Sequence, residues 1–125
     1  MIRSSPTRGE IWWVDLDPTK GSEIQKTRPA VVISSPAFDH LPVRIVVPLT
    51  TWQAKFLRQA NKMLIPHSSV NGLPNDSAAD FLQIRSVALE RFGARIGALE
   101  AKLVEELAAG VVVAVDYSPQ RRDLG

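Results

Sequence analysis

The chain has 125 residues and no cysteine, and its hydrophobic share of 45% and charged share of 22% are those of an ordinary soluble globular protein. One domain of this size buries roughly two-thirds of its unfolded surface, so a core needs neither disulfides nor metals. The lack of cysteine excludes a disulfide framework, a thiolate zinc site and a thiol nucleophile.

The N-terminal segment is polar, and the longest apolar run, residues 110–115, is far shorter than a membrane helix. These features predict a cytoplasmic protein with no signal peptide and no membrane contact. We expect a single domain with a core at about residues 8–115 and flexible termini.

The net charge of +2 is unevenly distributed along the chain. Residues 1–62 hold nine Lys and Arg against five Asp and Glu, whereas residues 63–125 hold six against eight. Arginine outnumbers lysine ten to five, and its planar fork suits phosphate oxygens. The first half is therefore where we expect a nucleic-acid backbone to bind.

Nine prolines divide the chain into short segments, which is typical of a small β-rich barrel or sandwich. Alternation and β-branched runs predict strands at residues 10–16, 30–33, 44–49, 62–65 and 77–87, the last bent near Gln83. The apolar run 30–33 is predicted to be buried on both faces. Trp12 and Trp13 point to opposite faces, so we expect one in the core and the other at an interface.

Residues 99–115 are predicted to form a C-terminal helix, with Leu103, Leu107 and Val111 as its core-facing stripe and Val104 and Ala108 beside it. Gly110 and the valines after it lower helix propensity, so a strand over this last stretch is the alternative. The polar tail, residues 118–125, is expected to fray. Strands followed by one helix predict a mainly β, half-open barrel with the helix across it.

Several common chemistries are not supported. The chain has no P-loop, no dinucleotide-binding glycine pattern and no His-Glu-x-x-His motif. Its carboxylates are scattered along the sequence, so neither a metal nor another cofactor is expected. His40 and His67 lie in different loops, and nothing in the sequence brings them together as an acid–base pair.

The loop at residues 17–27 leads into a strand through Arg28 and Pro29. Because Pro29 disfavours helix at the preceding residue, Arg28 is predicted to sit at the rigid root of a flexible loop. With Lys20 and Lys26, it could attract phosphates, although a charged surface loop would have the same composition.

Three segments are similar to a known family. They are residues 8–18 with Gly21-Ser22-Glu23 and 28–33, residues 46–51, and residues 78–87 followed by Arg91. Together with the C-terminal helix, residues 8–115 resemble the MazF/PemK family of toxin ribonucleases. The resemblance implies a small SH3-like half-open barrel of the CcdB and MazF kind, a homodimer, and a cognate antitoxin with an acidic, partly disordered segment.

The resemblance also implies metal-independent cleavage of single-stranded RNA at a short sequence. Arg28 and Thr50 match the family's catalytic arginine and threonine, with Thr51 as the alternative threonine. Attack by the RNA 2′-hydroxyl would leave a 2′,3′-cyclic phosphate and a 5′-hydroxyl. Glu23 is a candidate base, or it holds Arg28 in place.

Other residues are expected to bind the RNA. The candidates are Lys20, Ser22, Gln25, Lys26, Thr51 and Gln83. Thr51 and Gln83 would lie near Thr50 if the third and fifth strands are neighbours. Trp52 and Phe56 either stack on unpaired bases or pack against the barrel or a dimer partner.

Two other functions remain open on the same barrel. A non-enzymatic toxin resembling CcdB would bind gyrase, but the Arg28-Pro29 block argues against it. A catalytically inactive module would bind RNA or an antitoxin, but the presence of both Arg28 and Thr50 argues against lost catalysis.

Overall fold

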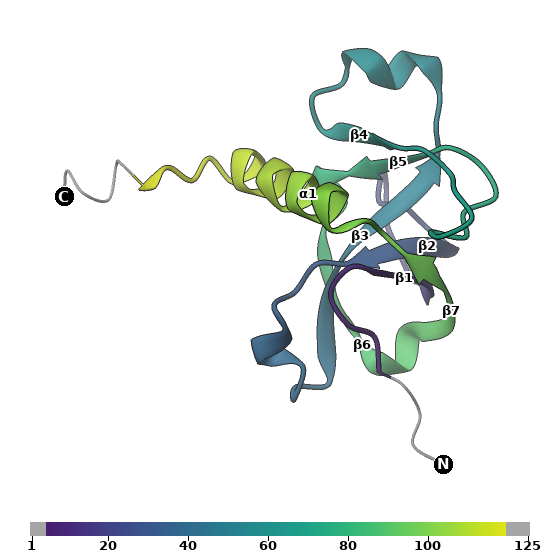
Figure 1. The fold of residues 1–125 in the computed structure, drawn as a ribbon, viewed down its shortest axis with the longest axis vertical. Coiled ribbons are helices and arrows are strands. Elements are labelled where there is room, and N and C mark those ends of the chain that lie inside the picture. Colours follow the sequence, from purple (N-terminus) through teal and green to yellow (C-terminus); the bar gives the residue numbers. More distant parts are fainter. Residues whose placement is uncertain (1–4, 120–125) are drawn as a thin grey trace.

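The computed structural model describes residues 5–119, which form a curved β-sheet with one helix packed against it (Figure 1). The strands are β1 (Glu10–Asp15), β2 (Thr27–Val32), β3 (Val43–Thr51), β4 (Lys62–Ile65), β5 (Ser77–Asp80), β6 (Arg85–Ala88) and β7 (Phe92–Ala98). Short 3₁₀ turns are η1 (Pro36–Phe38), η2 (Ala54–Arg58), η3 (Phe81–Gln83) and η4 (Leu89–Arg91), and the helix is α1 (Ala101–Ala114). No helix within residues 5–119 is long and apolar enough to cross a bilayer.

The strand order is β4-β5-β3-β2-β1-β7, and β6 pairs with β3. Strand β3 organises the sheet, because its first half pairs with β6, its middle with β2 and its last residues with β5, all antiparallel. Strands β4 and β7 stand at the two ends of this order, so the sheet curves without closing. This arrangement confirms the predicted half-open, mainly β barrel with a C-terminal helix.

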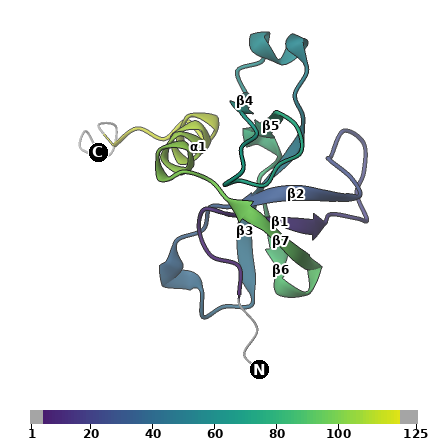
Figure 2. The ribbon, with the colours of Figure 1, turned by 45° about the vertical axis from the view of Figure 1, so that its right-hand side comes forward.

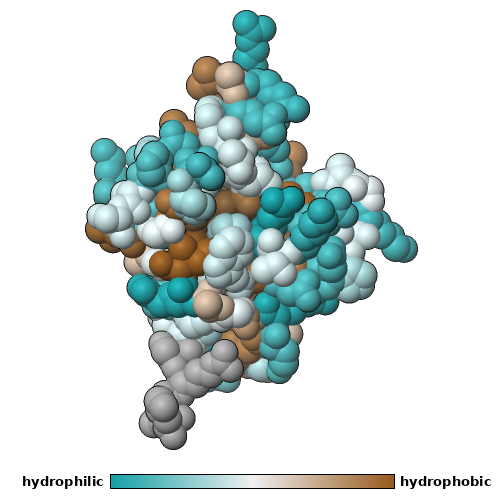
Figure 3. Space-filling view, turned by 90° about the vertical axis from the view of Figure 1, so that its right-hand side faces the viewer, coloured by the Kyte–Doolittle hydropathy of each residue, from teal (hydrophilic) through white to brown (hydrophobic). Residues whose placement is uncertain are grey.

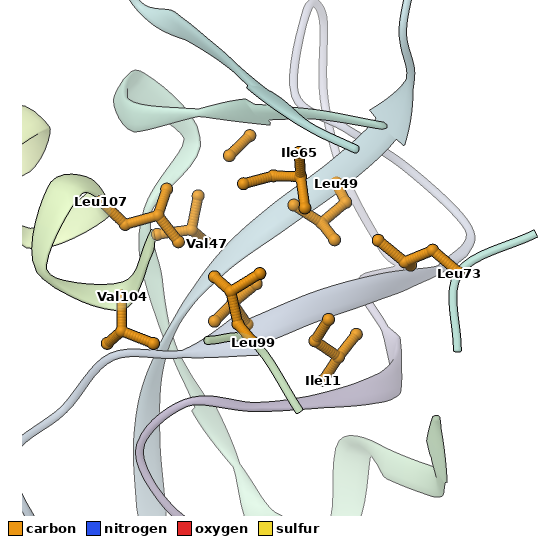
Figure 4. Close-up of a cluster of buried hydrophobic side chains, with 10 residues drawn as sticks. Ile11, Val47, Leu49, Ile65, Leu73, Leu99, Val104 and Leu107 are labelled. Carbon is orange, nitrogen blue, oxygen red and sulfur yellow. The ribbon is translucent and has the colours of Figure 1, made fainter. Parts of the chain in front are cut away.

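The middle of the sheet is buried on both faces. Ile11, Val31 and Val47 face one core, which α1 covers with Val104 and Leu107 (Figure 4). Their neighbours along the same strands face a second core, whose buried members are Trp12, Val14, Leu16, Ala30, Val32, Val46 and Val87. Side chains alternate across a strand, so burial on both faces explains the uninterrupted apolar run in β2.

Helix α1 continues through residues 110–114, so the strand alternative for this stretch is wrong. Leu107 is fully buried as predicted, and Val104, expected beside the stripe, is the other buried side chain of α1, whereas Leu103 and Val111 are half-buried. The helix is therefore rotated slightly from the predicted stripe.

Gly110 is required for the packing of α1. A Cβ at this position would lie 2.2 Å from Cζ of Phe81, well inside van der Waals contact. The residue that lowers helix propensity therefore allows η3 to approach the helix axis.

Two features of the sheet differ from the sequence prediction. Residues 77–87 form two strands, β5 and β6, because η3 turns the chain between them. Asp80 caps η3 by accepting a hydrogen bond from the Leu82 N–H at 3.0 Å. Strand β7 was not predicted, since its two glycines and exposed residues give it no clear alternation. It pairs with β1 through two register shifts.

The tryptophans of β1 behave partly as expected. Trp12 is buried, and Trp13 is 39% exposed.

On the face drawn in Figure 3, hydrophilic side chains predominate, with hydrophobic ones exposed between them. Of the tail expected to fray, residues 120–125 lie outside the described part of the chain.

Glu10 links β1 to β7 and provides a test of the fold by pH. Burial raises the pKa of Glu10, but hydrogen bonds from the Thr7 N–H, Arg95 and Trp12 outweigh it and lower the pKa overall. A lowered folded-state pKa gives stability that is complete above the ordinary glutamate pKa of about 4.3 and is lost as pH falls through the folded value.

We therefore expect Glu10→Gln to reduce the free energy of unfolding at pH 7 but to flatten its decline below about pH 4.3. Urea unfolding at several pH values measures both effects. Glu105→Gln is the control, because its carboxylate is largely exposed and, among residues 5–119, pairs only with Arg8. An identical decline in wild type and Glu10→Gln would contradict the assignment.

Candidate functional site

Two adjacent hollows share three residues. The larger hollow, about 480 Å³, is a groove lined by Ser22, Ile24, Arg28, Thr50, Thr51, Gln53, Phe56, Lys62, Asp80 and Gln83. The smaller hollow, about 140 Å³, is lined by Arg28, Thr50 and Thr51 together with residues that include Trp13 and Pro29. Arg28 and the two threonines therefore lie between the two hollows, where both can be reached.

Arg28 lies within β2, opposite Val14 of β1, so it belongs to the sheet and not to the loop before it. Its Nε donates to the Gln25 carbonyl at 3.2 Å. No residue within 5–119 accepts a hydrogen bond from its two terminal nitrogens. A half-buried guanidinium with free donors, held by a strand, is suited to bind an anionic group at a fixed position.

Other arginines in the chain have structural functions. Arg44 is 2% exposed, although it belongs to the basic half expected to bind a nucleic acid. Arg44 donates to the backbone oxygens of Pro6, Asp39, Leu41 and Val43. Arg85 donates to the Leu16 carbonyl, and Arg91 donates to the carbonyls of Asp15 and Asp17. The excess of arginine over lysine therefore reflects backbone anchoring as well as any binding of phosphate.

Thr50 and Thr51 are the last residues of β3 and pair with Ala78 and Ser77 of β5. Strands β3 and β5 are thus neighbours, which is the condition under which Thr51 and Gln83 were predicted to lie near Thr50. Thr50 is half-buried and Thr51 is exposed. Both line the groove and the smaller hollow, so the two threonines differ in burial and not in the hollows that they reach.

The β1–β2 loop projects beyond the sheet (Figure 2) but is fastened to it. The side-chain amide of Gln83 accepts from the Ile24 N–H and donates to the Ser22 carbonyl, both at 3.1 Å. At the base of the loop, Asp17 accepts from the Lys26 N–H at 3.0 Å. These bonds hold Ser22 and Gln83 at the groove.

The remaining predicted site residues lie on the loop outside the groove lining. Glu23 accepts a hydrogen bond from the Lys20 N–H at 2.5 Å and, among the described residues, makes no ion pair with Arg28. Lys20, Gln25 and Lys26 are exposed. The structure therefore brings together Arg28, Thr50, Thr51, Ser22 and Gln83, and leaves the other four candidates at the loop surface.

The groove also contains an ion pair that the sequence analysis missed. Lys62 Nζ lies 2.7 Å from Asp80 Oδ2, and the two side chains are 15% and 7% exposed. The same ammonium lies 5.1 Å from the centre of the Phe56 ring. Lys62 and Asp80 face each other across the β4–β5 pairing, so only the strand register could have revealed them.

Phe56 and Trp52 pack against each other edge to face, with ring centres 5.7 Å apart. Phe56 is buried, which agrees with the barrel-packing interpretation and leaves its ring little surface for stacking. Trp52 is half-buried. The pair stiffens the β3–β4 connection that forms one wall of the groove.

Among residues 5–119, no three His, Asp or Glu side chains come together in a way that could hold a metal ion. His67 Nδ1 lies 2.6 Å from Asp76 Oδ1, an exposed pair in the β4–β5 connection. Hydrogen bonds from the backbone and ring of His67 lower the pKa of Asp76. Neither His40 nor His67 lines the groove.

Sequence comparison identifies the class of protein. Residues 7–115 match the family described as PemK-like, MazF-like toxin of type II toxin–antitoxin systems. The chain therefore belongs to this family, which confirms the resemblance drawn from residues 8–115.

Its curated relatives are named endoribonucleases. The chain is 39% identical over 106 residues to endoribonuclease MazF9 of Mycobacterium tuberculosis, covering 80% of this chain and 87% of the relative. It is 35% identical over 94 residues to endoribonuclease toxin MazF of Escherichia coli K12, covering 74% and 77%.

Solved structures share the fold. MazF from Deinococcus radiodurans superimposes with a TM-score of 0.77 at 17% identity, covering 92% of this chain and all of that one. A mycobacterial endoribonuclease solved in complex with its cognate antitoxin gives 0.71 at 16% identity, covering 91% and 98%. These structural similarities establish the fold, and the match of residues 7–115 to the family establishes the class of protein.

Proposed function

We propose that this toxin is a metal-independent endoribonuclease that cleaves single-stranded RNA in the cytoplasm at a short sequence. The observation that supports this most directly is Arg28, a strand-held guanidinium whose terminal nitrogens have no acceptor within residues 5–119 and which shares a groove with Thr50. The family's endoribonuclease relatives agree with it.

The chemistry needs few protein groups, because RNA supplies its own nucleophile. Attack of the 2′-hydroxyl on the adjacent phosphorus forms one P–O bond, breaks the bond to the 5′ oxygen, and builds negative charge on the phosphoryl oxygens. The 2′-hydroxyl loses its proton, and the leaving 5′ oxygen gains one, so the two fragments together have the composition of the starting RNA. A guanidinium already fixed at that position stabilises the transition state more than the ground state. The products are a 2′,3′-cyclic phosphate and a 5′-hydroxyl.

Thr50 is the second proposed catalytic residue. Its hydroxyl can donate a hydrogen bond to a phosphoryl oxygen or orient the 2′-hydroxyl. Its half-buried position at the end of β3 fixes that hydroxyl more firmly than the exposed side chain of Thr51. Glu23, considered as a base, already caps the Lys20 N–H, so we assign it to shaping the loop.

The other candidates divide between the groove and the loop. Ser22, Thr51 and Gln83 line the groove and are placed to contact the nucleotides beside the reacting phosphate. Lys20, Gln25 and Lys26 stand on the exposed loop, where the two lysines attract the RNA backbone.

The test is cleavage of a long unstructured RNA in excess EDTA, with fragment ends identified by mass spectrometry. Cuts at one short repeated sequence with cyclic phosphate ends are expected. Intact RNA with inhibition of DNA gyrase would favour the CcdB-like alternative, which family membership does not support. Tight RNA binding without cuts would favour the inactive module.

Trp13 is expected to stack on an unpaired base next to the cleaved bond. It is 39% exposed and lines the smaller hollow beside Arg28 and Thr50. Stacking of one base is worth about 1–3 kcal/mol, so Trp13→Ala should weaken RNA binding by roughly 5- to 150-fold, and Trp13→Phe much less.

Fluorescence anisotropy of labelled RNA, in an Arg28→Ala background that prevents cleavage, measures this affinity. The matched control is Phe38→Ala, since Phe38 is 57% exposed on η1 and lines neither hollow. If Trp13→Ala leaves affinity unchanged but alters the sedimentation coefficient, Trp13 belongs to a subunit interface instead.

We further propose that the protein acts as a homodimer and is inhibited by a cognate antitoxin with an acidic, partly disordered segment. Support comes from the solved complexes of similar fold with antitoxins and from the excess of basic residues in the first half of this chain. Sedimentation analysis tests the dimer, and RNA protection by an acidic protein encoded nearby tests the partner.

A further inference from the structure

Lys62 differs from the other lysines in how firmly it is held. It lies at the start of β4, its side chain is 15% exposed, and its Nζ is 2.7 Å from Asp80 Oδ2. The Phe56 ring lies 5.1 Å away and adds a second attractive contact to the ammonium. A surface lysine samples many rotamers, whereas this ammonium is fixed in the groove wall.

Asp80 serves as its anchor. Oδ1 of Asp80 accepts from Asn61 Nδ2 at 2.8 Å and from the Leu82 N–H at 3.0 Å, which leaves Oδ2 for Lys62. An ammonium group has three protons to donate, and Asp80 receives one. No other residue within 5–119 accepts from Lys62, so two donors remain for a molecule in the groove.

A phosphate is a poor match for these donors. The carboxylate 2.7 Å from Nζ cancels most of the positive charge and would repel a second anion brought to the same place. A neutral acceptor avoids this repulsion. The keto oxygens of guanine and uracil are such acceptors, and lysine commonly donates to guanine O6 in nucleic-acid recognition.

We infer that Lys62, held by Asp80, is a specificity-determining residue that donates a hydrogen bond to the keto oxygen of a guanine or uracil at one position of the recognised RNA. The inference rests on the proposed function, because the groove that contains Lys62 also contains Arg28 and Thr50. Adenine and cytosine present an amino group where the keto oxygen would lie, so they are disfavoured at this position.

The experiment compares cleavage of a randomised single-stranded RNA pool, with cut sites read by sequencing. The test variant is Lys62→Met with Asp80→Asn, which removes the donors without leaving a buried charge unpaired. The control is Lys55→Met, which removes one exposed positive charge from η2 at a residue outside the groove lining. Lys62→Arg is a second variant that keeps the donors and the charge.

We expect wild type and Lys55→Met to require a keto base at one position of the site. The double variant should still cut, but with that preference reduced about 10-fold or more, as for loss of a base contact. Lys62→Arg should retain the preference. Uniformly slower cutting with an unchanged site, together with a shallower salt dependence, would mean a phosphate contact and would overturn the inference.

Failure of the proposed function has a different signature. If wild type cuts nothing, the same pool is bound to Arg28→Ala protein with and without the Lys62→Met and Asp80→Asn changes, and retained RNA is sequenced. Keto enrichment that depends on Lys62 would support the inference without catalysis. Its absence would refute the inference as well. Thermal unfolding of each variant confirms that it is folded.

Discussion

Arg28→Ala is expected to reduce RNA cleavage about 100- to 1000-fold, which is the usual loss when one fixed donor to a developing oxyanion is removed. Arg28→Lys should recover little activity, because an ammonium cannot reproduce the two-pronged geometry of a guanidinium. Single-turnover rates at saturating protein measure the effect on the chemical step. Stability should change little, since the Arg28 side chain makes one weak hydrogen bond within the described part of the chain, to the Gln25 carbonyl at 3.2 Å.

The matched control is Arg58→Ala, which removes the same charge from an exposed position on η2 outside both hollows. It tests whether charge alone, rather than position, supports cleavage. Equal losses in the two variants would assign Arg28 to general attraction of RNA. Full activity of Arg28→Ala would refute its catalytic role.

Gly110→Ala is expected to destabilise the protein by about 1–3 kcal/mol, the usual cost of overpacking a core. Helix propensity alone predicts the opposite, a gain of about 1 kcal/mol. Packing prevails because the new methyl would lie 2.2–2.5 Å from three ring atoms of Phe81, which is itself packed against the core under α1. Urea unfolding followed by circular dichroism gives the free-energy change.

Phe81→Leu combined with Gly110→Ala provides the control for this mechanism. Leucine lacks the ring tip that meets the methyl, so the double variant should lose less stability than the sum of the two single variants. Strict additivity would show that the ring is not the obstacle. A Gly110→Ala protein more stable than wild type would show that α1 shifts freely.

Local patterns in the sequence predicted most of the sheet. The β-branched run of β2 and the alternating residues of β1 and β3 are local signals, and each corresponds to an observed strand. Strand β7 lacked such a signal. Gly93 and Gly97 interrupt its pattern, and the Cβ that Gly97 lacks would lie 2.4 Å from the Asn71 carbonyl. Its place in the sheet comes from tertiary structure, through its pairing with β1 and this close approach to Asn71.

The residues of the site also form two groups, those that local sequence patterns identify and those that only the tertiary structure reveals. Arg28 and Thr50 could be named because they lie in segments that resemble the family. Lys62 and Asp80 are 18 residues apart, and their ion pair exists only because β4 and β5 pair in one register. The structural functions of Arg44 and Arg91 were equally hidden, since their acceptors are backbone oxygens that composition does not reveal.

The two proposed catalytic residues lie on β2 and β3 in the middle of the sheet, whereas much of the groove wall comes from the β1–β2 and β3–β4 connections. Strands buried on both faces tolerate little change, but surface connections accept substitution and altered length. Under the proposed function, a toxin built this way would change its target sequence by exchanging these connections while keeping one reaction. Grafting the β3–β4 connection of a relative onto this chain is therefore expected to redirect where the RNA is cut while leaving the chemical ends of the fragments unchanged.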